Sequence, residues 1–122
     1  MLDQIVLHEW VKLYNWDDGL VPIWPIVDSN ETEHATALMI YWRLEGPYSV
    51  AKPGCITAGA RQCLDLVRER LLAGFYRKGK LRYDPIADNQ LSRTQVHLLR
   101  KGGVPDELIQ PKYPSDVGES GL

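Results

Sequence analysis

Asp17 and Asp18 form a tight pair of carboxylates directly before Gly19. Paired carboxylates can bind a divalent metal ion or serve as a general acid and base. They can also stabilise a turn, because Asp side chains accept hydrogen bonds from nearby backbone amides. An EF-hand loop would need acids at alternate positions and a Glu after them, and these are missing. We therefore favour a turn and its cap for this pair, with a metal-dependent enzyme as an alternative.

The histidines and cysteines do not have the spacing of a metal site. None of His8, His34 and His97 lies three to five residues from another His or from a Cys. Cys55 and Cys63 are eight residues apart, form no C-x-x-C motif, and are expected to stay reduced. The chain also lacks a nucleophile elbow and a phosphate-binding glycine loop. We expect no catalytic residue, no bound metal and no cofactor, and a protein that is not an enzyme.

Charge is unevenly distributed along the chain, although the net charge is only -2 and the pI is about 5.9. Residues 1–50 carry two basic and eight acidic side chains, a net charge of -6, whereas residues 51–101 carry eleven basic and four acidic, a net charge of +7. Residues 68–82 contain basic side chains with aromatic ones among or directly after them, a pattern that can contact nucleic acid. These are Arg68, Arg70, Arg77, Lys78, Lys80 and Arg82, with Phe75, Tyr76 and Tyr83. Because the whole chain is not basic, we favour a solvated face here. A nucleic-acid-binding adaptor remains an alternative.

Apolar residues at three- and four-residue steps predict helices over residues 3–14, 31–45, 58–77 and 89–101. One further turn is expected at residues 104–109, and Pro22 suits the first turn of a short helix. Thr57 and Asp88 are the candidate N-caps of the third and fourth long helices. A loop is expected at residues 47–56.

The first two long helices differ in their apolar pattern. The second is apolar almost all round from Ala35 to Trp42, so it should lie at the centre of the fold. The first should turn one side to the core and keep Asp3, Glu9 and Lys12 in water. Its expected core side comprises Ile5, Val6, Trp10, Leu13 and Tyr14. In the last helix, Leu91, Leu98 and Leu99 should point inward.

These elements predict an all-α or mainly α fold, a compact helical bundle of four or five helices with room for a minor hairpin near Leu81 and Tyr83. Residues 1–110 should form a single globular domain, and residues 111–122 a flexible tail. The longest apolar run is far below the roughly 20 residues that a membrane span needs. The N-terminus lacks the basic region of a signal peptide, so a cytoplasmic location is expected.

Two segments carry a resemblance to a known family. Residues 13–19, Leu-Tyr-Asn-Trp-Asp-Asp-Gly, are followed by Pro22 and then by Thr-Ala-Leu-Met-Ile-Tyr-Trp at residues 36–42. This pattern resembles a bacterial family of small domains of unknown function with a Y-N-W-D-D-G signature and a T-A-L-x-x-[FY]-[WY] helix. Segments 74–76, 83–85 and 104–108 are similar to its longer members. Residues 30–34 depart from the Asn-Cys-Asp type of stretch found in many relatives.

The resemblance implies a function in bacterial competition. The family has no established enzyme activity, and its members often lie beside toxin genes, which implies an immunity role. We therefore expect an immunity protein that forms a heterodimer with a cognate toxin, for which a nuclease is one candidate. Acids and aromatic side chains suit such an interface. The residues expected to contact the partner are Trp16, Asp17, Asp18, Trp24, Asp28, Glu31, Glu33 and Glu45. For Trp16 and Trp24, packing in the core is the alternative.

Overall fold

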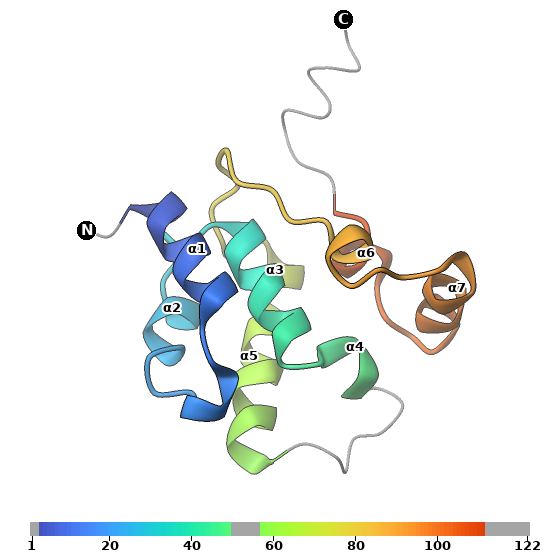
Figure 1. Cartoon of the computed structure of the whole chain (residues 1–122), viewed down its shortest axis with the longest axis horizontal. Coiled ribbons are helices and arrows are strands. Elements are labelled where there is room, and N and C mark those ends of the chain that lie inside the picture. Colours follow the sequence, from blue (N-terminus) through green and yellow to red (C-terminus); the bar gives the residue numbers. More distant parts are fainter. Residues whose placement is uncertain (1–2, 50–56, 112–122) are drawn as a thin grey trace, which may run out of the picture.

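The computed structural model describes residues 3–49 and 57–111, which fold into α-helices and short 3-10 helices (Figure 1). The all-α fold is confirmed, with seven α-helices in the described residues, more than the four or five expected. These are α1 (Gln4–Leu13), α2 (Trp24–Asp28), α3 (His34–Arg43), α4 (Gly46–Ser49), α5 (Ala58–Ala73), α6 (Pro85–Asp88) and α7 (Arg93–Lys101), with 3-10 helices η1 (Trp16–Asp18) and η3 (Asp106–Leu108). Cys55 and the expected tail from residue 112 onward lie outside the described residues.

Helix α3 is the central element, as its apolar sequence predicts. Every residue from His34 to Trp42 is buried, and α3 packs against α1 on one side and α5 on another (Figure 1). The helix is shorter than the expected 31–45 because Glu33 has an extended backbone. There the chain pairs with Arg77, whose amide donates to the Thr32 carbonyl (3.1 Å) and whose carbonyl accepts from the His34 amide (2.8 Å). This isolated parallel bridge takes the place of the expected minor hairpin, since residues 3–49 and 57–111 contain no strand.

Helix α1 turns the opposite side to the core from the one expected. Leu7 and Val11 are its buried residues, and the His8 Nδ1 atom lies 2.9 Å from the Thr36 hydroxyl of α3 in a hydrogen bond. The residues predicted to be buried lie in water, except Tyr14, which is half-buried. The prediction was wrong because α1 carries two apolar stripes, and helical periodicity alone does not say which one meets α3.

Helix α5 begins where the sequence predicts and ends earlier. The Thr57 hydroxyl accepts a hydrogen bond from the Ala60 amide (3.3 Å), which confirms Thr57 as the N-cap. Gly74 caps the helix in the left-handed conformation (φ 73°), so α5 ends at Ala73, four residues before the expected end at residue 77. At the other end of α3, residues 46–49 form α4 where a loop was expected.

None of the helices in the two described stretches combines the length and apolar character that crossing a lipid bilayer requires.

The C-terminal helices attach to the last turn of α3, away from α1 and α2 (Figure 1). The Trp42 indole N–H donates to the Leu108 carbonyl (2.8 Å), and Arg43 pairs with Asp88 (2.7 Å). Asp88 also accepts a hydrogen bond from the Tyr83 hydroxyl (2.5 Å). Asp88 therefore lies in α6 and joins it to α3, and it is not the N-cap that the sequence suggested.

Helix α7 starts at a capping box. The Ser92 hydroxyl accepts from the Gln95 amide (3.1 Å), while the Gln95 side chain accepts from the Ser92 amide (2.8 Å). Val96 is the buried residue of this helix, and Leu98 is exposed, contrary to expectation. Leu98 follows Val96 by two residues, about 200° around the helix, and so lies on the opposite side, whereas Leu91 and Leu99 pack against the core as predicted.

Ser92→Ala should destabilise the protein by about 1 kcal/mol, because it removes the side-chain acceptor of the capping box. Thr94→Ala is a matched control, since Thr94 is exposed in the same first turn and takes no part in the cap. Thermal unfolding of both variants measures the difference. Equal changes in the two variants would contradict a stabilising role for this cap.

Candidate partner-binding surface

The Y-N-W-D-D-G segment folds into a tight turn after α1, and three of its residues build the turn. The Tyr14 hydroxyl donates to the Gly19 carbonyl (2.6 Å), and the Asn15 side-chain oxygen accepts from the Asp17 amide (3.1 Å) to cap η1. Gly19 has φ 92° and ψ -176°, a conformation that side chains other than hydrogen rarely permit. The turn is therefore held by its tyrosine, asparagine and glycine.

Trp16 joins this turn to the hydrophobic core. It is half-buried against the hydrophobic core, and its ring meets Tyr14 edge-on with 5.4 Å between centroids. Tyr14 in turn stacks on Trp10 at 4.8 Å, which gives a row of three aromatic rings from α1 into the turn. Trp24 is also half-buried against the core. Both tryptophans thus take part in core packing and keep part of their surface in water.

Asp17 and Asp18 project from the turn into solvent. Neither carboxylate forms a hydrogen bond or an ion pair with any residue in 3–49 or 57–111. The cap of η1 is Asn15, so the expectation that the aspartates cap the turn is wrong. In the same stretches, no group of three or more His, Cys, Asp or Glu side chains is placed to hold a metal ion. The turn leaves two adjacent carboxylates available to another molecule.

The other acids predicted to bind a partner occupy different environments. Asp28 pairs with Arg70 (2.9 Å), which also donates to the Val27 carbonyl and covers the Phe75 ring at 4.4 Å. Glu31 and Glu45 are exposed, and Glu45 has a positive φ of 60° between α3 and α4.

Glu33 is not at the surface, contrary to expectation. It is buried, its amide donates to the Gln4 side chain (3.1 Å), and its carboxylate accepts from the Leu81 amide (3.1 Å). A Cβ atom at Gly79 would lie only 2.0 Å from the same carboxylate. Glu33 therefore fastens the connector after α5 to the start of α3, a task that sequence reasoning missed because the partner segment is 48 residues away.

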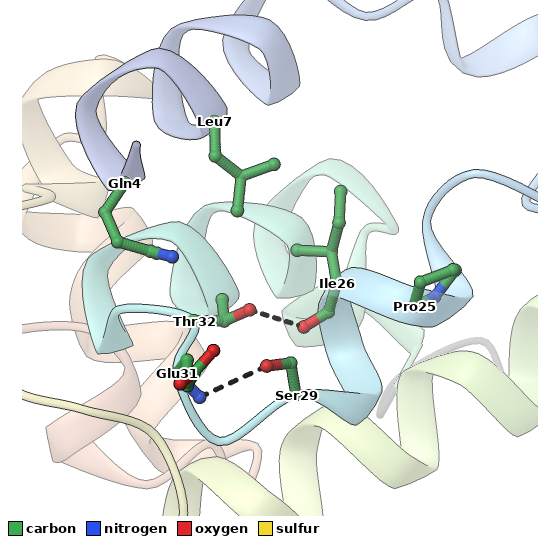
Figure 2. Close-up of a pocket in the computed structure, with 7 residues that line it drawn as sticks. All are labelled: Gln4, Leu7, Pro25, Ile26, Ser29, Glu31 and Thr32. Atoms are coloured by element: carbon green, nitrogen blue, oxygen red, sulfur yellow. Dashed lines mark hydrogen bonds between the residues drawn. The ribbon is translucent and has the colours of Figure 1, made fainter. Parts of the chain in front are cut away.

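A hollow of about 200 Å³ lies beside Glu31, between the start of α1 and the end of α2 (Figure 2). The Thr32 hydroxyl donates to the Ile26 carbonyl (2.7 Å), and the Glu31 amide donates to the Ser29 hydroxyl (3.2 Å). Gln4 and Leu7 close the hollow from α1. The Asp17–Asp18 turn follows the opposite end of α1, about 15 Å away for a helix of this length. The predicted acids therefore do not form one cluster.

The basic segment 68–82 is only partly engaged in the fold. Arg70 is held by Asp28 and Phe75, whereas Arg68, Arg77, Lys78 and Lys80 are exposed.

Cys63 of α5 is a buried free thiol, and burial raises its pKa to about 11, so it is not a reactive nucleophile at neutral pH.

A family model, described as a domain of unknown function (DUF4274), matches residues 3–70. The chain belongs to this family. No curated protein and no solved structure matches it significantly. The DUF4274 match contains the Asp17–Asp18 turn and ends within α5, so α6 and α7 lie beyond it.

Proposed function

We propose that this DUF4274 protein works by binding another protein, and that the partner is a toxin that it neutralises in the cytoplasm as an immunity protein. One observation carries the proposal: the turn is built by Tyr14, Asn15 and Gly19, while Asp17 and Asp18 are exposed and pair with no residue in the described part of the chain. Two adjacent like charges repel each other, so the Asp17–Asp18 pair does not serve to stabilise the turn. Its presence is better explained by attraction to a cationic group of another molecule.

A nuclease is the toxin class that suits this turn best. Nucleases bind the phosphates of nucleic acid with basic clefts, and exposed carboxylates attract such a surface and speed its association. Trp16 lies beside the aspartates and is half-buried, so it offers a rigid aromatic edge next to the charges. The genomic neighbourhood implied by the family resemblance points the same way.

The test is the binding rate of Asp17→Lys/Asp18→Lys to the product of the adjacent gene, in a catalytically inactive form. At low salt, charge reversal should slow association about 10- to 100-fold, because steering is electrostatic, and the effect should shrink as salt is added. Asp65→Lys/Glu69→Lys makes the same change in charge on the exposed side of α5 and is the control.

Two results would speak against the proposal. If the wild-type protein neither binds the neighbouring gene product nor protects cells that express it, the immunity function is wrong. If it binds but both double variants associate at the wild-type rate, the Asp17–Asp18 turn is not the contact.

The exposed cations after α5 support a second candidate, an adaptor that binds nucleic acid. Arg77, Lys78 and Lys80 lie in water on the connector between α5 and α6. Salt-sensitive binding of a labelled duplex DNA, weakened by Lys78→Glu/Lys80→Glu, would favour this function over immunity.

A further inference from the structure

The side of α1 that faces away from α3 is formed by large apolar residues. Ile5 is 62% exposed, Val6 56%, Trp10 41% and Leu13 80%. We refer to these four residues as the α1 face. At about 100° per residue, Val6, Trp10 and Leu13 fall within roughly 60° of the helix circumference, and Glu9 lies between them and Ile5. Contiguous exposed apolar residues of this size commonly mark an interaction site.

The α1 face continues into the Asp17–Asp18 turn. Trp10 stacks on Tyr14, and the Tyr14 hydroxyl holds the far end of the turn at the Gly19 carbonyl. Beyond the turn, Val21 is 84% exposed. The packed rings of Trp10, Tyr14 and Trp16 thus connect the α1 face to the turn that carries the Asp17 and Asp18 carboxylates.

The charges around this surface indicate what covers it. Between residues 3 and 21 the exposed charged side chains are four acids, Asp3, Glu9, Asp17 and Asp18, and one base, Lys12. Two more exposed bases, Arg77 and Lys80, line a hollow with Ile5 near the start of α1. A helix that lies on a membrane has basic residues along its border, because lipid surfaces are negatively charged, so the mostly acidic border from Glu9 to Asp18 is of the wrong sign. A second copy that docks turn against turn would bring the same acids together. A basic protein surface complements the border.

We propose that the α1 face and the Asp17–Asp18 turn form one docking surface for a protein whose contact area has an apolar centre bordered by lysine or arginine. The docking surface rests on the proposed function, because that function supplies the protein partner. What the docking surface adds is where the partner binds and the chemistry of the partner's contact area. Leu13 and Trp10 supply the apolar centre of the contact, since aromatic and large aliphatic side chains at the middle of an interface dominate affinity. Glu9, Asp17 and Asp18 pair with the partner's cations.

The test is site-specific photo-crosslinking in the living host. A benzophenone amino acid replaces Leu13 in one variant and Leu98 in another; Leu98 is 58% exposed on α7, outside the surface. We expect one partner to be crosslinked from position 13 and not from position 98, and to be identified by mass spectrometry. Leu13→Asp and Asp17→Asn/Asp18→Asn should each weaken the affinity of that purified partner about 10-fold, while Leu98→Asp changes it less than about 2-fold.

Other outcomes overturn the docking surface. These are a crosslink at position 13 no stronger than at position 98, a crosslink to a second copy of the chain, or an affinity unchanged by Leu13→Asp. Unchanged thermal unfolding of Leu13→Asp shows that the effect is on binding and not on folding.

The two proposals fail separately. A partner that docks on this surface but is not a toxin refutes the immunity function and leaves the surface in place. A toxin that binds Leu13→Asp as tightly as wild type refutes the surface and leaves the immunity function in place.

Discussion

Gly46→Ala should destabilise the protein by about 2–3 kcal/mol, because there is no space for one more carbon atom at this position. A Cβ atom at Gly46 would lie 2.2 Å from the Tyr41 ring, far inside van der Waals contact. The ring does not move aside easily, since Tyr41 is fully buried in α3. Relief of the clash must therefore shift either the ring or the start of α4. Urea unfolding followed by tryptophan fluorescence measures the loss.

Gly59→Ala is the matched control for this effect. A Cβ atom at Gly59 meets nothing within 4 Å, and the residue lies in the first turn of α5. Alanine has the higher helix propensity, so this variant should be as stable as wild type or more stable by up to about 1 kcal/mol. If both variants lost stability equally, backbone flexibility and not the Tyr41 contact would explain the effect of Gly46→Ala.

Acidification should destabilise the protein by about 3 kcal/mol through His34 alone. Burial lowers the pKa of His34 from 6.5 to about 4, with the nearby Lys78 charge acting in the same direction. The unfolded chain therefore takes up a proton below pH 6.5, while the folded protein does not until about pH 4. Stability is complete above pH 6.5 and falls as the pH drops from 6.5 to about 4. Burial also lowers the pKa of His8, which adds a loss of the same sign.

The pH effect is measured by urea unfolding at pH 7.5 and pH 4.5 in the wild-type protein and in His34→Gln. The variant has no imidazole to protonate, so the difference between its two stabilities should be smaller than in wild type by about 2–3 kcal/mol. An equal difference in the two proteins would show that His34 does not cause the loss. His97→Gln is the control, because His97 is exposed on α7.

The central helix was predictable because its sequence leaves few alternatives. Residues 35–42 are apolar on every side, and a helix of that kind has neighbours all round, as α3 does. The start of α5 was also predictable, since Thr57 is a local N-cap whose partner is three residues away. Both features depend on residues close to one another in sequence.

Features that depend on distant segments were not predictable. Helix α1 has a buried pair, Leu7 and Val11, and an exposed apolar side, and only contact with α3 decides between them. Glu33 resembled a solvent-exposed acid in the first turn of a helix. Its burial depends on the Leu81 amide, which tertiary folding brings to it.

The candidate site was predicted in part. The residues of the turn were identified, but their tasks were not, because Asn15 and not an aspartate caps η1. The sequence also assigned Glu31 and the aspartate pair to one acidic face, whereas they lie toward opposite ends of α1. Spacing along the chain shows which residues can form a turn, and it does not show how far two turns lie apart.

The internal bonding of the Y-N-W-D-D-G turn has a consequence for specificity. The side-chain hydrogen bonds of Tyr14 and Asn15 both end on backbone atoms of the same hexapeptide, so any relative with these residues and Gly19 can inherit the turn whatever it binds. Recognition can then diverge through exposed positions that do not contact the turn residues, such as 6 and 13 on the adjoining helix. Exchanging these two side chains between relatives should transfer partner choice while the turn keeps its shape.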